Sequence, residues 1–500
     1  MEILKIHPAD NIFIALKELP IGTPLEEGVF TKEPIRQGHK VAGQRIPKGS
    51  IVLKFAQPIG IASRDIAAGE HVHLHNLSYI PSSSNHSYGS ASREVPHTKL
   101  ANFQGIIRPN GQIATRNYIG ILTSVNCSAT VARHIADQFR GSILEQWPNV
   151  DGVVALTHKT GCGMASEGEA MNILRRTIGG YARHPNFFGI LIVGLGCEAN
   201  QVDRLLDAED LSPSENLFDL IIQEEGGSSA TVRGGVSKIK AMLDKANKIE
   251  RQSVSVSHLK LGLQCGGSDG FSALTANPAL GVASDILVQH GGTAVLSETP
   301  EIYGAEHILL SRAVSRDIAD KLLERLSWWQ AYTSRTGETL DNNPSPGNKE
   351  GGLTTILEKS LGAVAKGGTS PLVDVVQFAE TLKTSGFVFM DTPGYDPVSV
   401  TGQVAGGCNI VCFTTGRGSC FGCKPVPSLK LATNTPMYRR MIEDMDINCG
   451  EIIDGTATVE EMGRKIFDLI VATASGKKTA SERLGYGEDE FVPWVIGATV

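Results

Sequence analysis

The distribution of apolar and polar residues changes near residue 105. Before about residue 78, the apolar runs are short, as in Asn11–Ala15 and Ser50–Phe55, and Gly/Pro turn signals such as Pro20–Gly22 separate them. Short β-branched runs between turn residues predict a small β domain over residues 1–78. The polar stretch that follows, 79–104, has a serine-rich run and no periodicity, which predicts a linker.

From residue 105 onward, continuous apolar runs alternate with helix-like runs. The continuous apolar runs include Asn117–Thr123, Gly152–Leu156 and Gly189–Gly194, and a helix-like run spans Ser128–Ala136. Continuous apolar runs suit strands that are buried on both faces of a parallel sheet. The pattern therefore predicts a large α/β body with mostly parallel sheets.

We divide this α/β body into a catalytic domain at 105–345 and a C-terminal domain at 346–500. The division falls in a segment rich in Pro, Gly and Asn, around residues 342–352. Such a composition predicts a long surface loop.

Composition narrows the function. The chain has 500 residues, with 46 Lys and Arg against 53 Asp and Glu, and a formal net charge of -7. A mildly acidic protein has no electrostatic basis for binding nucleic acid, because that affinity comes largely from Lys and Arg. No run approaches the ~18–20 apolar residues that cross a bilayer, and the start lacks a signal-peptide pattern. We expect a cytoplasmic protein without nucleic-acid or membrane partners; monomer and homodimer both stay open.

Cysteines follow several of the strand-like runs. The nine cysteines are an odd number in a long chain, which disfavours a disulfide framework. Ligands bind where parallel strands end, and thiolates favour iron, zinc and iron–sulfur centres. One interpretation is a convergent metal or cluster site, and the other is four buried structural thiols. The four cysteines that directly follow such runs are Cys127, Cys162, Cys197 and Cys265.

Histidines supply a second candidate site. His71, His73 and His75 alternate along the chain, so in a strand their imidazoles would share one face and could bind a transition metal. The solvent-exposed face of an edge strand would explain the same pattern. His39 follows a glycine in a short connection and is an acid or base candidate, because imidazole titrates near neutral pH.

Two further motifs carry less weight. Cys420-Phe421-Gly422-Cys423 is a C-x-x-C motif, but the chain has no second one, and we interpret it as an incidental loop pair. Gly194–Ala199 mimics the G-x-G-x-x-A dinucleotide fingerprint. No clear acidic residue at a strand end follows ~20 residues later, so we expect no nicotinamide cofactor.

Several longer motifs are more specific. They are Arg116–Tyr118, Ser124–Ser128, His158–Gly163, Gln264–Asp269, Thr275–Pro278, Ser297–Glu301, Asp391–Gly394 and Thr401–Gly407. Together they resemble the altronate/galactarate dehydratase family, and the segment Gln37–Val41 is similar to the SAF (β-clip) domain at the N-terminus of that family. The resemblance covers essentially the whole chain.

The resemblance implies a carbon–oxygen lyase that dehydrates a small sugar acid with the help of Fe²⁺, or alternatively Mn²⁺. The His71–His75 run is more like the altronate branch, whose reaction converts D-altronate to 2-dehydro-3-deoxy-D-gluconate and water in hexuronate breakdown. A galactarate dehydratase and a sulfolactate sulfo-lyase are alternatives within the same group. A non-catalytic sugar-acid-binding protein is the alternative from another class.

Dehydration of a hydroxy acid needs a base, an acid and a cation near the carboxylate. We expect Arg116 to bind the substrate carboxylate, because a guanidinium pairs with it through two hydrogen bonds. We expect the small domain to close over the mouth of the sheet and bring His39 to the substrate. An iron–sulfur centre on the cysteines is the alternative to a single ion held by the histidine or cysteine set. The acid–base candidates are His39, His158 and Lys159, and the further substrate contacts are Asn126, Asp269 and Glu298.

Overall fold

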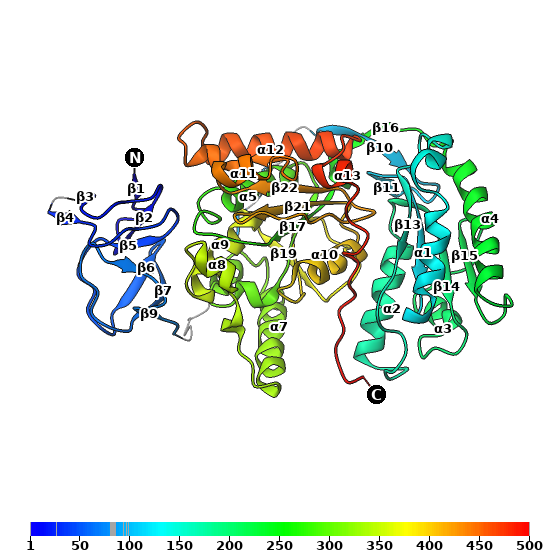
Figure 1. The fold of residues 1–500 in the computed structure, drawn as a ribbon, viewed down its shortest axis with the longest axis horizontal. Coiled ribbons are helices and arrows are strands. Elements are labelled where there is room, and N and C mark those ends of the chain that lie inside the picture. Colours follow the sequence, from blue (N-terminus) through cyan, green and yellow to red (C-terminus); the bar gives the residue numbers. More distant parts are fainter. Residues whose placement is uncertain are drawn as a thin grey trace.

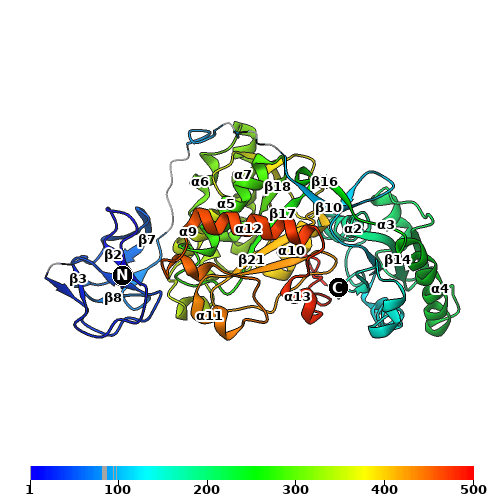
Figure 2. The same cartoon turned by 90° about the horizontal axis from the view of Figure 1, so that it is seen from above.

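The computed structural model describes residues 2–26, 28–80, 87–93, 95–96, 98 and 100–499. Figures 1 and 2 show three units in a row. A β-rich N-terminal domain (2–80) lies at one end, an α/β second domain (105–247) at the other, and a larger α/β C-terminal domain (256–499) between them. The predicted fold class is confirmed, and the serine-rich part of the predicted linker at 81–86 lies outside the described residues.

The N-terminal domain consists of short antiparallel strands, because glycine- and proline-containing turns interrupt the apolar runs. Its apolar side chains, such as Ile14, Val52 and Ile59, form a small core that Phe271 of the C-terminal domain completes. One sheet has the order β1-β2-β5-β8, a second has the order β6-β7-β9, and β3 pairs with β4. The strands are β1 (Ile3–Leu4), β2 (Ile12–Ala15), β3 (Pro24–Glu26), β4 (Val29–Phe30), β5 (Lys40–Ala42), β6 (Ile51–Lys54), β7 (Gln57–Ala62), β8 (His71–Val72) and β9 (Leu77–Ser78).

The second domain is a parallel sheet with the strand order β13-β12-β14-β15. Every residue of β12 is buried, as its continuous apolar run predicts. Helices α1 and α4 cover one face of the sheet, and α2 and α3 cover the other. The elements are β12 (Tyr118–Thr123), α1 (Ala129–Asp137), β13 (Gly152–Leu156), α2 (Glu169–Ala182), β14 (Phe187–Gly194), α3 (Val202–Ala208), β15 (Leu217–Ile221) and α4 (Ser228–Ala246). A small sheet of β10 (Asn102–Ile107), β11 (Ile113–Ala114) and β16 (Gln252–Ser255) connects this domain to the next one.

The C-terminal domain is a parallel sheet of seven strands in the order β19-β20-β18-β17-β21-β22-β23. The strands are β17 (Lys260–Cys265), β18 (Thr293–Leu296), β19 (Leu372–Val376), β20 (Gly386–Met390), β21 (Ile410–Thr415), β22 (Ser428–Ala432) and β23 (Ile447–Asn448). Helices α5 (Ala276–Gln289) and α12 (Val459–Ala474) pack on one face, and α10 (Asp396–Ala405) packs on the other. The remaining helices are α6 (Glu306–Leu310), α7 (Arg316–Arg335), α8 (Pro346–Glu350), α9 (Ile356–Val364), α11 (Thr435–Arg440) and α13 (Ala480–Leu484).

The strand order has a switch point beside β17. From β17 the chain moves to β18 on one side and later returns to β21 on the other side. Helix α5, which follows β17, lies on the opposite face from α10, which precedes β21. Ligands of open α/β sheets bind at the carboxyl ends of strands at such a point, so the loops after β17 and β21 are the first place to look for a site.

The predicted boundary between residues 345 and 346 is wrong. A single sheet contains strands from both sides of this boundary, from β17 to β23, so the division between the α/β domains falls between residues 247 and 256. The Pro/Gly/Asn-rich segment belongs to a long excursion between β18 and β19, and it contains α8. No helix in the described ranges has the length and apolar character to cross a membrane.

Candidate functional site

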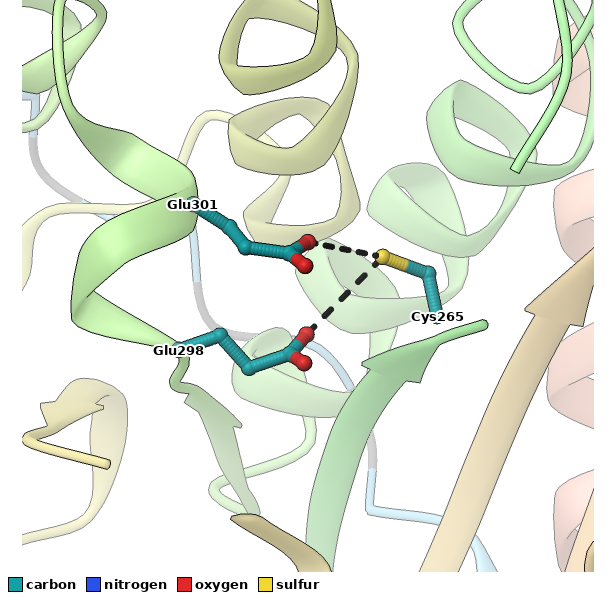
Figure 3. A group of neighbouring side chains, drawn as sticks. All are labelled: Cys265, Glu298 and Glu301. Atoms are coloured by element: carbon teal, nitrogen blue, oxygen red, sulfur yellow. Dashed lines mark hydrogen bonds between the residues drawn. The ribbon is translucent and has the colours of Figure 1, made fainter. Parts of the chain in front are cut away.

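A buried group of chemically reactive side chains lies at the carboxyl ends of β17 and β18. Cys265 is the last residue of β17, and Glu298 and Glu301 follow β18 at the 3-10 helix η4 (Thr299–Ile302). Figure 3 shows both carboxylates pointing toward the thiol, with the Cys265 Sγ 3.8 Å from Glu298 Oε2 and 3.6 Å from Glu301 Oε2. All three side chains are buried. Together with three neighbours described below, they form the Cys265 cluster: Cys265, Glu298, Glu301, Lys359, Lys366 and Asp396.

Two lysines oppose the negative charge of this cluster. Lys366 Nζ lies 2.8 Å from Cys265 Sγ and 3.6 Å from Glu298 Oε2. Lys359, from α9, donates to Glu301 Oε1 at 2.6 Å and to Asn343 Oδ1 at 2.8 Å. Because ammonium and carboxylate groups alternate, the site can hold several charges away from water.

The environment separates the acidities of the three carboxyl groups. Burial raises the pKa of Glu298 well above its ordinary value, and the charge of Glu301 raises it further. Burial also raises the pKa of Glu301, but the ammonium groups of Lys359 and Lys366 outweigh burial and leave that pKa below its ordinary value. Burial raises the pKa of Asp396 to about 7, with a further contribution from Glu301. A set of carboxyl groups with different proton affinities is typical of acid–base sites.

The backbone at Glu298 is strained. Its φ of 71° and ψ of 67° lie in the left-handed region, which costs a non-glycine residue on the order of 1–3 kcal/mol. A hydrogen bond of 2.9 Å from its backbone N–H to Thr392 Oγ1 holds it there. Glu298 Oε1 is buried and has no hydrogen-bond partner among the described residues. An orphaned carboxylate oxygen in a strained, buried loop indicates a place for a cation or a substrate group.

The same three residues are the tightest group of metal-ligand types. In the described part of the chain, Cys265, Glu298 and Glu301 are the group whose sulfur and oxygen atoms all lie within 4.8 Å of one another. Sulfur and carboxylate donors suit a divalent transition metal, and the free Glu298 Oε1 offers a further donor atom. Cys265 and Glu298 were candidates from the sequence, although Glu298 was expected to contact the substrate. Glu301 lies in the same Ser297–Glu301 motif and was missed.

A second feature, a cleft of about 270 Å³, lies at the switch point, and its lining contains none of the six cluster residues. Asp269, four residues after Cys265, lies on its wall together with Arg417 and Asn434, which follow β21 and β22. The Asp269 carboxylate accepts hydrogen bonds from Thr433, Asn434 and two backbone amides of its own loop. Burial raises the pKa of Asp269, while these donors lower it. Asp269 therefore orders the loop that joins the cleft to the Cys265 cluster.

The N-terminal domain supplies the other wall of this cleft, with Arg36, Gln37 and His39. His39 Nε2–H donates to Glu350 O at 3.0 Å, and its Nδ1 accepts from His71 Nε2–H at 3.0 Å. A Cβ on Gly270 would overlap the carbonyl of Gly38, so glycine is required where the two domains meet. The small domain therefore covers the carboxyl edge of the sheet near the switch point, and His39 faces the cleft. Its acid–base role stays a prediction.

The four histidine rings gather at this domain contact. The ring centroids of His39, His71, His73 and His75 lie 5.1–5.5 Å apart in the pairs that touch. The strand ends at Val72, so the rings meet through a turn and not along one strand face. Burial lowers the pKa of His71 to about 3 and that of His73 to about 4, which keeps both rings neutral. Their nitrogens do not form a close ligand group like that around Cys265.

The prediction that Arg116 binds the substrate carboxylate is wrong. Its side chain is buried, and its guanidinium pairs with Glu482 through bonds of 2.5 and 2.9 Å. The remaining donors bind the backbone carbonyls of Thr115, Thr473 and Lys477. The guanidinium does pair with a carboxylate through two hydrogen bonds, but that carboxylate belongs to the protein and not to a substrate. Arg116 therefore links the second domain to the C-terminal helices.

Three other candidates lie on the second domain. His158 is buried, its Nε2–H donates to Thr123 O at 2.9 Å, and its Nδ1 accepts from Thr160 N–H at 3.3 Å. Burial lowers its pKa to about 4. Both ring nitrogens of His158 are hydrogen-bonded, as are those of His39, so its acid–base role, like that of His39, stays a prediction. Lys159 and Asn126 are exposed at the same edge, where Asn126 Nδ2 donates to His158 O, and neither belongs to the Cys265 cluster.

The four strand-end cysteines do not form one site. Cys265 is buried among the glutamates and lysines of the C-terminal domain, whereas Cys127, Cys162 and Cys197 are exposed at the edge of the other sheet. Two separate sheets carry them, and the sequence could not show where one sheet ends and the next begins. The alternative interpretation, four buried structural thiols, is also wrong, because three of the four cysteines are exposed.

Comparisons with known proteins agree with this architecture. Residues 1–79 match the altronate/galactarate dehydratase SAF domain, 105–247 the second domain of D-galactarate dehydratase/altronate hydrolase, and 256–499 the C-terminal domain of D-galactarate/altronate dehydratase. The altronate dehydratase of Bacillus subtilis (strain 168) is 36% identical, with 97% of each chain covered. The L-threo-forming galactarate dehydratase of Escherichia coli (strain K12) is 38% identical over 96% of this chain and 94% of its own.

A more distant relative is the beta subunit of the (2R)-sulfolactate sulfo-lyase of Chromohalobacter salexigens, 30% identical over 77% of this chain and 96% of its own. The fold and the site define an α/β protein with an N-terminal β domain packed against its larger sheet and a buried cluster of thiol, carboxyl and ammonium groups at the strand ends. The chain belongs to the altronate/galactarate dehydratase family.

Proposed function

We propose that this sugar-acid dehydratase, a hydro-lyase, converts D-altronate to 2-dehydro-3-deoxy-D-gluconate and water in the cytoplasm. The observation that carries the proposal is the Cys265 cluster, which combines carboxyl groups of different acidity with two buried ammonium groups at the carboxyl ends of β17 and β18. Relatives named altronate dehydratase cover nearly the whole chain. The His71–His75 run, which is like the altronate branch, favours this substrate.

The reaction removes the proton on C2 and the hydroxyl group on C3 of the acid. Loss of the proton places negative charge on the substrate carboxylate, and Lys359 and Lys366 supply fixed positive charge that stabilises it. Asp396 is the half-buried carboxyl group of the cluster, at the first residue of α10, and is our candidate for the base. The proton that it takes can return to the departing hydroxyl to form water, and the enol then tautomerises to the 2-keto acid.

Fe²⁺, with Mn²⁺ as the alternative, fits the donor set of Cys265, Glu298 and Glu301. These donors lie close together, and Glu298 Oε1 is free of hydrogen-bond partners among the described groups. When bound, a divalent ion would act as a Lewis acid toward the substrate oxygens. Lys359 and Lys366 would stabilise the same negative charge as it develops on the substrate carboxylate.

The test uses protein purified without oxygen, depleted of metal with a chelator and resupplied with Fe²⁺ or Mn²⁺. Formation of a 2-keto acid is measured with D-altronate, galactarate and a panel of other aldonates and aldarates. We expect turnover to require the added metal and D-altronate to give the highest kcat/KM. A higher kcat/KM for galactarate would overturn the substrate assignment without affecting the assignment of the site.

The site itself is tested with Cys265→Ser, using Cys420→Ser as the matched control, because Cys420 is an exposed cysteine outside the cluster. We expect the Cys265 variant to remain folded and to lose both Fe²⁺-dependent turnover and the Fe²⁺ bound at this site. Addition of Fe²⁺ to metal-depleted protein measures that binding. The Cys420 variant should behave like the natural protein. Unchanged Fe²⁺ binding and turnover in Cys265→Ser would show that the reaction site lies elsewhere.

One observation favours galactarate as a second candidate. Three arginines, Arg36, Arg417 and Arg440, line the cleft, and galactarate carries a second carboxylate that such a residue could bind. Arg417 already pairs with Glu350 at 3.0 Å, so Arg36 and Arg440 are the better candidates. If galactarate is the substrate, Arg440→Ala should raise the KM for galactarate and leave that for D-altronate unchanged.

A further inference from the structure

The exposed cysteines of the chain are concentrated at one edge of the second domain. Free cysteine is among the most buried residue types, and five of the nine thiols here are buried. Of the four exposed thiols, three follow adjacent strands of one sheet: Cys162 after β13, Cys127 after β12 and Cys197 after β14. Parallel strands bring these three loops to the same edge. The Cys265 cluster uses none of the three.

The loops that carry these thiols are tied to one another. Asn126 N–H, beside Cys127, donates to Thr160 O at 3.0 Å, and Asn200 N–H, near Cys197, donates to Gly161 O at 3.0 Å. Gly161 adjoins Cys162, and a Cβ on it would overlap Ser124 O, so glycine is needed for the loops to approach. The three cysteines therefore lie on one connected platform.

A buried carboxylate reinforces the platform below the thiols. Glu198, next to Cys197, accepts a hydrogen bond of 2.6 Å from Ser124 Oγ and further bonds from the backbone N–H groups of Leu195 and Gly196. Gln223, which follows β15, donates from Nε2 to the Cys197 sulfur at 3.5 Å. Hydrogen bonds to cysteine sulfur are one of the ways in which proteins tune iron–sulfur centres.

We propose that Cys127, Cys162 and Cys197 bind an iron–sulfur cluster at the carboxyl edge of the second domain. Each cysteine binds as a thiolate, so assembly releases three protons, and two ferrous ions, two ferric ions and four sulfide ions enter without a change of oxidation state. This site is separate from the proposed dehydration site, and its existence does not depend on the identity of the substrate.

The spacing of the three thiols does not match a single tetrahedral ion. One tetrahedral zinc ion, with Zn–S bonds of about 2.3 Å, holds its sulfurs about 3.8 Å apart. The three thiols do not form a group with all ligand atoms within 4.8 Å, as Cys265, Glu298 and Glu301 do. A cubane cluster spreads its cysteine sulfurs more widely, because each one binds a different iron.

The platform provides three thiolates and no fourth. The fourth strand of this sheet, β15, is followed by Gln223 where the other loops carry cysteine, and His158 uses both ring nitrogens within the domain. Among the described residues of these loops, one iron of a four-iron cluster therefore lacks a cysteine ligand. That iron would be open to water or to an oxygen-bearing ligand.

The test uses the full chain, expressed and purified without oxygen and then reconstituted with sulfide and equal amounts of ferrous and ferric iron, so that assembly of the cluster needs no further oxidant. We expect roughly four iron and four sulfide ions per chain at this site, a broad visible absorption band, and an electron paramagnetic resonance signal after reduction. Cys127→Ser, Cys162→Ser and Cys197→Ser should each lose the sulfide and the absorption band. Cys265→Ser and Cys420→Ser should keep them, because neither residue belongs to the platform.

Alkylation of the natural chain gives a second readout that needs no variant. With the cluster bound, Cys127, Cys162 and Cys197 should resist iodoacetamide, while Cys420 reacts; after oxidative removal of the cluster, all four should react. Three outcomes would each overturn the proposal. The reconstituted protein could contain no sulfide, the three thiols could bind one zinc ion per chain instead, or the visible band could survive replacement of all three cysteines. These measurements require no substrate, so their failure is distinct from a failure of the dehydratase assignment.

Discussion

Lys40 of the N-terminal domain and Glu358 of α9 form an ion pair in which both side chains are buried. Lys40 Nζ lies 2.8 Å from Glu358 Oε2, and Lys54, from the same domain, lies 2.8 Å from Glu358 Oε1. Thr354 also donates to the Glu358 carboxylate, through its hydroxyl and its backbone N–H. One carboxylate thus ties two lysines of the small domain to the body, next to the contact that His39 makes with Glu350 O.

Replacing Glu358 by Gln should separate the two domains. The change leaves two buried ammonium groups without a counter-charge, and breaking a buried pair in this way costs about 3–5 kcal/mol. We expect a loss of that size in the free energy of unfolding and faster proteolysis between the N-terminal domain and the body. Glu215→Gln removes an exposed partner of Lys245 and should change stability little. Equal losses in the two variants would mean that the buried pair has no special role.

The same pair predicts how docking depends on pH. Burial raises the pKa of Glu358, but Lys40 and Lys54 outweigh burial and hold it far below the ordinary value of 4.5. The unfolded chain therefore binds the proton more strongly than the folded one, and the stabilisation from Glu358 is complete above about pH 4.5 and is lost progressively below it. Burial lowers the pKa of Lys40 to about 8. Between that pH and the ordinary value of 10.5, the unfolded chain holds more protons, so this lysine makes stability rise with pH.

Thermal unfolding of the natural protein and of Glu358→Gln over a pH series checks this sign. The difference between the two proteins should shrink as the pH falls below 4.5. A difference that stays constant down to pH 3 would contradict the assignment of the effect to the Glu358 carboxylate.

Local patterns in the sequence predicted most of the fold. They could not predict which residues pair when those residues lie far apart in the chain. The apolar run at Tyr118–Thr123 identified a buried strand because burial on both faces needs only a continuous apolar segment. The partner of Arg116, by contrast, is Glu482, and no local pattern connects residues that are 366 positions apart. The Cys265 cluster shows the same limit, since Lys359 and Lys366 lie about 100 residues after the thiol and carry no motif that points to it.

Arg116→Ala tests the structural role of this residue. The change leaves the partly buried Glu482 without its partner and frees three backbone carbonyls, so a loss of about 3–5 kcal/mol in stability is expected. Turnover per folded molecule at saturating substrate, and the KM, should stay near the natural values. An unchanged melting temperature together with a large rise in KM would restore Arg116 as a residue that binds the substrate carboxylate.

His39→Ala separates catalysis from docking, and His73→Ala is its matched control. Both rings donate to neighbouring backbone carbonyls of the body, His39 to Glu350 O at 3.0 Å and His73 to Lys349 O at 2.9 Å. Each variant should therefore lose about 1 kcal/mol of docking stability. Only His39 lines the cleft, however.

If His39 moves a proton in the reaction, its loss should lower kcat by about 10²–10⁴-fold, whereas His73→Ala should retain most of its turnover. The pKa of His39 is below its ordinary value of 6.5, mainly because of burial, so its ring is neutral at neutral pH and can accept a proton. Protonation of His39 should therefore lower kcat/KM only at pH values below 6.5. This decrease at acidic pH should be absent in His39→Ala. Equal losses of turnover in the two variants would mean that both act only through domain docking. Normal turnover in His39→Ala would show that this histidine holds the domains together and takes no part in the chemistry.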